Sequence, residues 1–193
     1  FYAELYKKNS VEEAISQENS DLELENPEIL ISEVENATKL SKNGKAPGND
    51  HISIDLLKCG GRPLFSILAK LFTRCIRERN IPDIWNNASI ILNHKKGDKE
   101  DIKNYRPISI LSAVYKVFTK IISTRINSAL DFNQPLEQAG FRAEFSTIDH
   151  LQTINELIER ANEYNIPLCF GFVDCQKAFD SVSHPKLISK LES

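Results

Sequence analysis

The chain has 193 residues, of which 41% are apolar and 26% charged, a composition typical of a globular protein with one sizeable core or two small lobes. No apolar run reaches the ~18 residues of a membrane span and no signal-peptide pattern is visible, so a membrane-spanning or exported protein is not predicted. Residues 1–38 hold 2 Lys/Arg against 10 Asp/Glu (net −8), residues 39–125 hold 17 against 7 (+10) and residues 126–193 hold 5 against 10 (−5). This basic block between acidic flanks favours a surface that binds a polyanion such as nucleic acid, with a solvated lysine-rich surface as the alternative.

The sulfur-containing residues indicate whether the chain is a piece of a longer product and which redox compartment it occupies. The sequence has no Met, which suggests a piece of a longer product, and four cysteines. Those cysteines form no CxxC pair and no cluster with histidine, so free and mostly buried thiols in a reducing compartment are expected. They are Cys59, Cys75, Cys169 and Cys175.

The first half of the chain is predicted to be mostly helical. Asn26 followed by Pro27 predicts a helix start, with Leu30, Val34 and Ala37 on its inner face. Two glycines and a proline predict a break over residues 43–50. The clearest helix follows Arg62-Pro63, because its apolar residues recur at intervals of three and four. We expect helices over residues 2–8, 11–18, 26–40, 53–58 and 62–80. The apolar face of the last one comprises Leu64, Ile67, Leu68, Leu71, Phe72, Cys75 and Ile76.

The second half predicts a hairpin, two long helices and a further strand. Residues 88–92 read as a short buried strand, 94–103 as a charged turn, and 105–110 as a returning strand interrupted by Pro107. Ser112 caps the next helix, whose inner face should hold Val114, Val117, Phe118, Ile121, Ile122 and Ile126. A loop is expected over 131–137, a helix over 147–164 behind the capping box of Ser146 and Asp149, a strand over 168–173, and a last helix from His184.

The most informative run is Phe172-Val173-Asp174-Cys175-Gln176-Lys177-Ala178-Phe179-Asp180. It follows an apolar segment and places a carboxylate where the predicted strand ends. Acids at strand ends are where metal and phosphate chemistry is commonly found in α/β folds. A strand-end Asp that caps the following turn is the competing interpretation.

Four ordered stretches together resemble the reverse transcriptases of non-LTR (LINE-type, RTE-like) retrotransposons. They are GKAPGND (44–50), ILNHKKGDKEDIKNYRPISILS (91–112), EQAGFRAEFSTIDHL (137–151) and FVDCQKAFDSVSH (172–184). Their order and spacing make the set specific, although each alone is a weak signal.

The resemblance implies a fold class and a division of the chain. The class is α/β (α+β), with helix-rich fingers and a short β-hairpin leading into the start of a palm, and the domain is incomplete. Residues 1–38 would be an acidic helical extension, residues 39–165 the fingers, and residues 166–193 the start of the palm. The chain ends before the second catalytic motif, so the 193 residues alone are expected to be inactive.

The resemblance also assigns roles at a nucleotide site. Asp174 would be a catalytic metal ligand for Mg²⁺, with two ions in the full-length parent and Mn²⁺ as a possible substitute. Phe179 would exclude ribonucleotides, its alternative being a core aromatic. Lys95, Lys96 and Arg106 would bind the incoming triphosphate, with a solvated turn as the alternative for the lysines.

The resemblance implies that Phe141 and Arg142 contact the template. In the same motif, Glu144 departs from the family pattern, which usually has a small or flexible residue there. The implied partners are an RNA template, a DNA primer and deoxynucleoside triphosphates, with no membrane, and the implied location is intracellular, in the nucleus or cytoplasm. Two alternatives stay open: a degenerate or domesticated retroelement relic that only binds nucleic acid, and a generic soluble α/β domain. Salt-sensitive nucleic-acid affinity would separate them.

Overall fold

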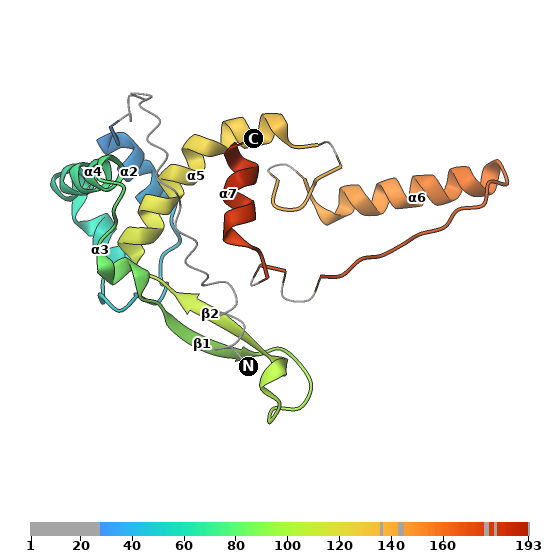
Figure 1. Cartoon of the computed structure of the whole chain (residues 1–193), viewed down its shortest axis with the longest axis horizontal. Coiled ribbons are helices and arrows are strands. Elements are labelled where there is room, and N and C mark those ends of the chain that lie inside the picture. The colour runs from blue at the N-terminus through green and yellow to red at the C-terminus, as the bar shows by residue number, and fades with distance from the viewer. Residues whose placement is uncertain (1–27, 136, 143–144, 176–177, 180, 193) are drawn as a thin grey trace. The chain divides into compact units, whose positions relative to one another are not determined.

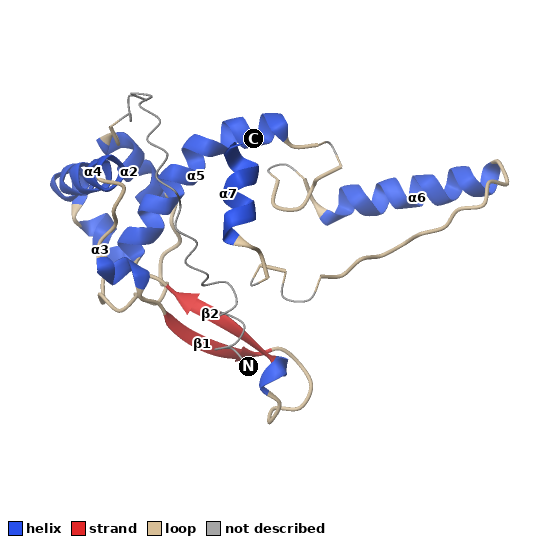
Figure 2. Ribbon diagram, in the orientation of Figure 1, coloured by secondary structure: helices blue, strands red, loops and turns tan. Residues whose placement is uncertain are grey.

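The computed structural model describes residues 28–135, 137–142, 145–175, 178–179 and 181–192. The helices predicted over 2–8 and 11–18, and the helix start at Asn26-Pro27, lie outside these residues. Contacts divide the described chain into two compact units, residues 28–138 and residues 139–192, and each is described by itself. The described elements are mostly helices with one two-stranded antiparallel hairpin, which confirms the predicted mixed, helix-rich class (Figures 1 and 2).

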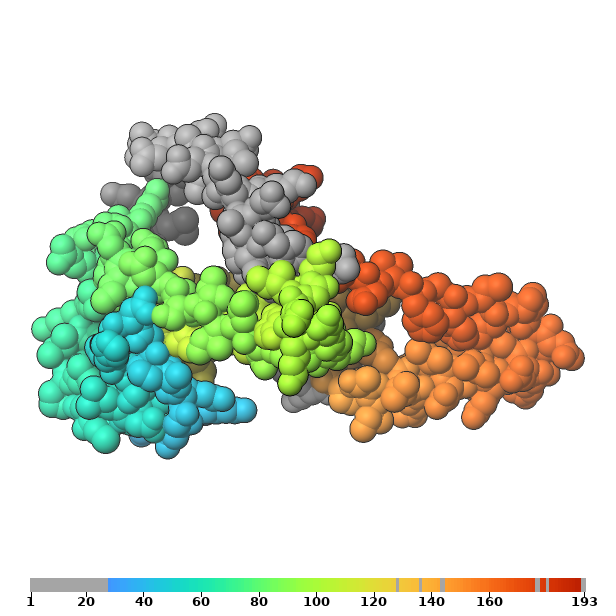
Figure 3. Space-filling model, turned by 90° about the horizontal axis from the view of Figure 1, so that it is seen from below, coloured from blue at the N-terminus to red at the C-terminus, as the bar shows by residue number. Residues whose placement is uncertain are grey.

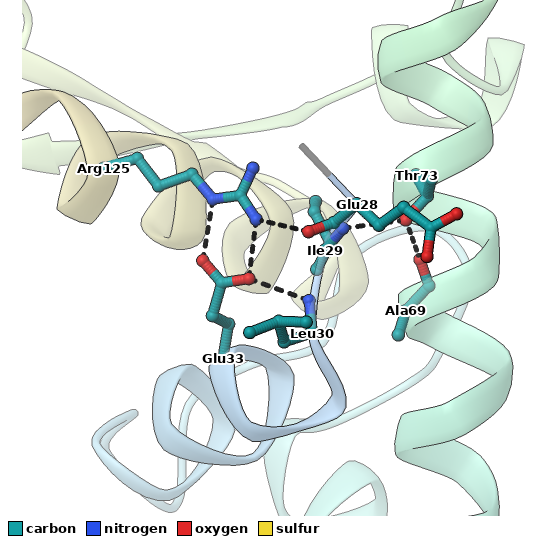
Figure 4. Close-up of polar contacts among 7 residues, drawn as sticks. All are labelled: Glu28, Ile29, Leu30, Glu33, Ala69, Thr73 and Arg125. Carbon is teal, nitrogen blue, oxygen red and sulfur yellow. Dashed lines mark hydrogen bonds and ion pairs between the residues drawn. The ribbon is translucent and has the colours of Figure 1, made fainter. Parts of the chain in front are cut away.

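Helix α2 (Ile31–Lys39) begins later than predicted, because residues 28–30 are not helical and Leu30, its N-cap, has an extended backbone. The Glu33 carboxylate accepts the backbone N–H of Leu30 at 2.8 Å and so caps the helix from within its first turn. The backbone N–H of Ile29 donates to Oγ1 of Thr73, on helix α4 (Gly61–Arg77), at 2.9 Å (Figure 4). Ile29 is therefore buried in place of Leu30, which is 59% exposed and was wrongly placed on the inner face.

Arg125 ties this entry segment to the long helix α5 (Ala113–Asn133). Its guanidinium donates to both carboxylate oxygens of Glu33, at 2.7 and 2.6 Å, and to the carbonyl oxygen of Glu28 at 2.8 Å (Figure 4). Hydrogen bonding to Arg125 lowers the pKa of Glu33 below its ordinary value of 4.5. Glu33 thus caps α2 and joins it to α5 with one carboxylate.

Helices α3 (Ile54–Cys59) and α4 (Gly61–Arg77) follow the predicted break. Ser53 Oγ accepts the N–H of Leu56 at 3.2 Å and caps α3. The inner face of α4 is rotated from the predicted one, because α4 packs against α2 and also faces Trp85 and Phe118: Ile67 is 64% exposed, whereas Phe65 and Ala69 are buried. Burial raises the pKa of the Cys75 thiol. The other three cysteines are exposed, so the expectation of mostly buried thiols was wrong.

The core of this unit lies between α2, α3, α4 and the first half of α5. Phe72 is fully buried at its centre, with its ring centroid 5.2 Å from that of Phe118 and 6.1 Å from that of Trp85. Ile126 is 43% exposed and does not join the inner face predicted for α5. The core residues are Ile29, Val34, Ala37, Ile54, Leu57, Phe65, Leu68, Ala69, Phe72, Cys75, Trp85, Ala113, Val114, Val117, Phe118 and Ile121.

Strands β1 (Ser89–His94) and β2 (Tyr105–Ile110) form the predicted hairpin in antiparallel register, with Ser89 opposite Ile110 and His94 opposite Tyr105. The hairpin projects from the helical body of its unit (Figures 1 and 3). Its strands contact mainly each other, so the expectation of a buried strand was wrong: Ile90 and Ile91 are 52% and 54% exposed. After Ser112, α5 runs to Asn133 and replaces the first part of the loop expected over 131–137.

The second unit holds α6 (Thr147–Glu163) and α7 (His184–Glu192), both close to their predicted positions. The capping box is confirmed, since the Asp149 carboxylate accepts the N–H of Ser146 at 2.6 Å. Residues 168–173 are irregular and exposed, so the predicted strand is wrong here. A strand needs a neighbour for its N–H and C=O groups, and no described residue pairs with this segment. None of the described helices is long and apolar enough to cross a membrane.

Candidate nucleotide and nucleic-acid site

The hairpin carries three of the predicted site residues. Arg106 lies directly opposite Asn93 on β1, on the face of the ribbon that also holds Ile91 and Ile108. The backbone N–H of Lys95 donates to the carbonyl oxygen of Asn104 at 2.8 Å, which continues the ladder by one pair. Lys95, Lys96 and Arg106 are all exposed. The hairpin therefore places three cations at or beside its tip, available to an anionic ligand.

The turn that presents the lysines is held by its own polar contacts. Gly97 adopts a φ of 91°, a conformation that favours glycine, and its carbonyl oxygen lies 3.2 Å from His94 Nε2. Asn104 Nδ2 donates to the carbonyl oxygen of Asp98 at 2.8 Å, and the Tyr105 hydroxyl donates to that of Lys99 at 2.9 Å. These bonds close the turn across its width, so Lys95 and Lys96 stand on a structured support.

The base of the hairpin is joined to the loop that contains the first of the four motifs. Ser89, at the start of β1, donates its hydroxyl to Asn49 Oδ1, and Ser112, just after β2, donates to Asp50 Oδ2 at 2.6 Å. The other Asp50 oxygen accepts the N–H of Ile52 at 3.2 Å. Two consecutive side chains thus bind both ends of the hairpin, a role that the sequence did not reveal.

Glycine at position 48 is required by this junction. A Cβ there would lie 2.7 Å from the backbone nitrogen of Ser112, closer than real contacts allow. Ser112 Oγ also accepts the N–H of Tyr115, at 3.4 Å, and so caps α5. The GKAPGND stretch therefore packs directly on the point where the hairpin turns into α5. A Gly-x-Asp pattern in a loop was the only signal in the sequence for this contact.

Asp174 lies in the second unit, exposed on an irregular segment and without a bonding partner among the residues that the structure describes. Two Mg²⁺ ions in catalytic geometry need several clustered carboxylates. Nowhere in the described part of the chain do three His, Cys, Asp or Glu side chains gather in a way that could hold a metal ion. The described residues therefore do not fit a complete two-metal centre, and the role predicted for Asp174 as a metal ligand stays a prediction.

Two other predicted residues in this unit meet each other. The rings of Phe141 and Phe179 pack edge to face with centroids 5.5 Å apart, although Phe141 is 96% and Phe179 78% exposed. The guanidinium carbon of Arg142 lies 5.0 Å from the centroid of the Phe145 ring, a cation–π distance. The residue predicted to exclude ribonucleotides thus lies beside one predicted to contact the template.

Phe141 also has an unusual backbone, with a φ of 63°. A bulky residue in the left-handed region of backbone conformation costs roughly 1–3 kcal/mol of folding free energy. Three residues of the run 172–180, Gln176, Lys177 and Asp180, lie outside the described residues, and so does Glu144. The structure therefore brings together two subsets of the predicted site, the cations of the hairpin and the Phe141–Phe179 pair.

Known proteins resemble this chain. A family profile described as reverse transcriptase (RNA-dependent DNA polymerase) matches residues 94–193. The probable RNA-directed DNA polymerase from transposon X-element of Drosophila melanogaster is 33% identical over 187 residues, which are 94% of this chain and 21% of that protein. The probable RNA-directed DNA polymerase from transposon BS of the same organism is 32% identical over 167 residues, 85% of this chain and 18% of that protein.

A third relative comes from a vertebrate. The transposon TX1 uncharacterized 149 kDa protein of Xenopus laevis is 32% identical over 170 residues, 88% of this chain and 13% of that protein. The chain spans about a fifth or less of the length of these relatives. The resemblance to non-LTR retrotransposon enzymes, read from the four motifs, is confirmed. Because the family profile covers more than half of the chain, the chain belongs to the reverse transcriptase (RNA-dependent DNA polymerase) family.

Proposed function

We propose that this chain forms the fingers and the first palm motif of a retrotransposon RNA-directed DNA polymerase, which extends a DNA primer on an RNA template with deoxynucleoside triphosphates. The observation that carries the proposal is the family match, which begins at His94 and includes both the hairpin tip and Asp174. Within this function residues 39–165 would be the fingers and 166–193 the start of the palm. The enzyme would act inside the cell, in the nucleus or cytoplasm.

The hairpin suits the triphosphate of the incoming nucleotide. Arg106 offers a planar pair of donors for a bidentate phosphate contact, and Lys95 and Lys96 offer point charges. Their exposure on a projecting ribbon leaves them accessible to a ligand that arrives from solvent. Phe179 would close the space beneath the sugar, so that a 2′-hydroxyl is excluded sterically.

Asp174 would supply one carboxylate to the metal centre of the full-length parent. The divalent ions expected there, Mg²⁺ or alternatively Mn²⁺, stabilise charge on the attacking and leaving oxygens of a nucleotidyl transfer. Among the described residues no group of three His, Cys, Asp or Glu side chains gathers to complete this centre. We therefore assign no metal-dependent step to these residues by themselves.

Primer extension by the full-length parent on an RNA template tests the proposal. Replacing Asp174 with Asn should lower the extension rate by about 100-fold or more, because a metal ligand is lost. The matched control is Asp83→Asn, which neutralises an exposed acid outside the proposed site. Equal rates for Asp174→Asn and the control would overturn the assignment.

The isolated polypeptide of residues 1–193 should show no primer extension, since its described residues assemble no metal-binding trio. Magnesium-dependent extension by the purified polypeptide, abolished by Asp174→Ala, would contradict this expectation. Ribonucleotide incorporation offers a separate check on Phe179. Phe179→Ala in the full-length parent should admit ribonucleotides that the parent rejects.

The described residues hold no group of three side chains that could bind a metal ion, and this favours a second candidate function. In this alternative the chain is a retroelement relic that binds nucleic acid and catalyses nothing. The basic block over residues 39–125 would provide that binding. This alternative predicts salt-sensitive affinity that Asp174→Asn leaves unchanged, with no extension activity in the full-length parent. Extension by the full-length parent that requires Asp174 would exclude it.

A further inference from the structure

A pocket of about 470 Å³ lies in the first unit, away from the hairpin tip. Its walls come from the end of α2 and the loop that follows, from α3, and from the first turns of α5. Its lining includes the buried apolar residues Ile54 and Ala113, which we call the apolar floor, and Leu40, which is 73% exposed. Four lysines line it: Lys42, Lys45, Lys116 and Lys120. The volume falls within the range of small-ligand sites.

The loop wall of this pocket is fixed from α3. Lys58 Nζ donates to the carbonyl oxygen of Ser41 at 2.7 Å and to the side-chain oxygen of Asn43. On the same helix the Asp55 carboxylate accepts the N–H of Gly44 at 3.1 Å. The two lysines of the loop therefore lie on a segment held by hydrogen bonds, and they line the same pocket as two lysines one turn apart on α5.

The four lysines differ from most cations of the neighbouring helices in their partners. Lys39 pairs with Glu35 at 2.6 Å and Arg125 pairs with Glu33. In the described part of the chain none of the four pocket lysines has an ion pair or a hydrogen-bond acceptor for its ammonium group, and no carboxylate lines the pocket. Four like charges around one cavity repel each other, so a multiply charged anion would stabilise the arrangement.

We infer that this pocket binds an unpaired strand of nucleic acid, with phosphates on the lysines and one unstacked base on the apolar floor. A duplex hides its bases, whereas a single strand offers both a charged backbone and a flat apolar ring. The choice of nucleic acid as the ligand rests on the proposed function. The pocket, its floor and its unpaired lysines do not depend on that function.

Binding of a fluorescein-labelled 12-nucleotide oligouridylate to the full 193-residue chain, followed by anisotropy across a salt series, tests this inference. Lys116→Gln with Lys120→Gln should weaken binding about tenfold and reduce the salt slope by about 1.4, the value for two lost single-strand phosphate contacts. Arg62→Gln with Lys70→Gln removes the same charge from exposed positions of α4 outside the pocket. The slope of this control should stay near that of the parent chain.

A second variant tests the apolar floor without changing charge. Ala46 lines the pocket, and Ala46→Phe should fill it and weaken binding about fivefold or more, the loss of one base-stacking contact. Ala88→Phe, at another exposed alanine, should leave affinity unchanged. Circular dichroism of each variant establishes that it is folded.

Three outcomes would overturn the inference: equal losses for the two lysine pairs, unaltered affinity in Ala46→Phe, or poly-glutamate competing as well as oligouridylate. The first two mean diffuse surface charge, and the third means a site for acidic protein segments. Asp174→Asn should not change the anisotropy. If the parent extends no primer but the chain binds oligouridylate through the pocket, only the proposed function is contradicted. If the parent extends a primer but binding does not depend on the pocket, only this inference is contradicted.

Discussion

Two helices of equal length show how differently the two units are built. Helix α4 and helix α6 each have 17 residues and an amphipathic sequence. Helix α4 buries five side chains, including Phe72 at 0% exposure, whereas α6 buries none among its described residues. On α6, Ile148 and Leu151 are 72% and 56% exposed. The amphipathic pattern therefore specifies which face can be buried, and only a packing partner buries it.

The largest effect is expected in the core of the first unit. Phe72→Ala removes a ring that contacts Trp85 and Phe118, and should cost about 3–5 kcal/mol of unfolding free energy. Phe170→Ala in the second unit, where the ring is 44% exposed, should cost less than about 0.5 kcal/mol. Urea unfolding curves measure both. Similar losses would show that the second unit is packed as well as the first.

The Arg125 junction should have the next largest effect. Arg125→Ala removes the bonds to Glu33 and Glu28, and we expect a loss of about 1–2 kcal/mol, limited because about a quarter of each charged side chain is exposed. Urea unfolding at neutral pH measures this loss. Arg77→Ala, which breaks a more exposed pair with Glu28, is the control and should cost less.

The same junction predicts a pH dependence. Because the folded-state pKa of Glu33 lies below its ordinary value of 4.5, its contribution is fully present above that value and is lost as the pH falls through the lowered pKa. Stability should therefore fall on acidification below about pH 4.5, and less steeply in Arg125→Ala. An unchanged acid dependence in the variant would contradict the assignment.

The loop at the base of the hairpin should give a smaller, local effect. Asp50→Ala removes the acceptor of the Ser112 hydroxyl and the Ile52 N–H, with an expected cost of about 1 kcal/mol. Amide hydrogen exchange should accelerate most along Ser89–His94 and Tyr105–Ile110. Asp83→Ala, which removes an exposed acid elsewhere, should leave the hairpin amides unchanged. Acceleration spread evenly over α4 as well would mean a global loss of stability.

The smallest change in unfolding free energy is expected from the cap of α6. Asp149→Ala removes the acceptor of the Ser146 N–H and should lower the helical circular dichroism signal while leaving the unfolding of the first unit unchanged. The bond to Ser146 also lowers the pKa of Asp149, so the cap should be lost as the pH falls below the ordinary value of 3.8. Glu159→Ala, in the second half of the same helix and away from its cap, is the control.

Local structure was predicted correctly where it depends on residues that are close together in the sequence. The cap at Ser112 and the capping box of Ser146 and Asp149 are confirmed, because each side chain bonds a backbone N–H only three residues away in the sequence. The hairpin is also confirmed, since its strands are separated by one charged turn. Asp174, Phe179 and the hairpin cations were identified by motif, and their roles stay predictions.

The failures occurred where distant segments decide. Leu30 was placed inward and Ile29 is buried, because Thr73 and Arg125, far along the chain, fix the entry to α2. The strand expected over residues 168–173 lacks a partner among the described residues, and a strand cannot satisfy its own backbone. The predicted burial of the first hairpin strand was also wrong, because helices surround the core and the hairpin projects from them.

By itself the sequence determined most of the described helix positions, the caps at Ser112 and Ser146, the hairpin and the motifs that identify the family, because each depends on residue type and short spacing. Tertiary structure alone decided that Asn49 and Asp50 bind both ends of the hairpin, that Glu33 joins α2 to α5, and that four lysines line one pocket. These features join residues that are 40 or more positions apart or that come from separate helices. Spacing along the chain carries no information about such contacts, since they form only when the helices pack.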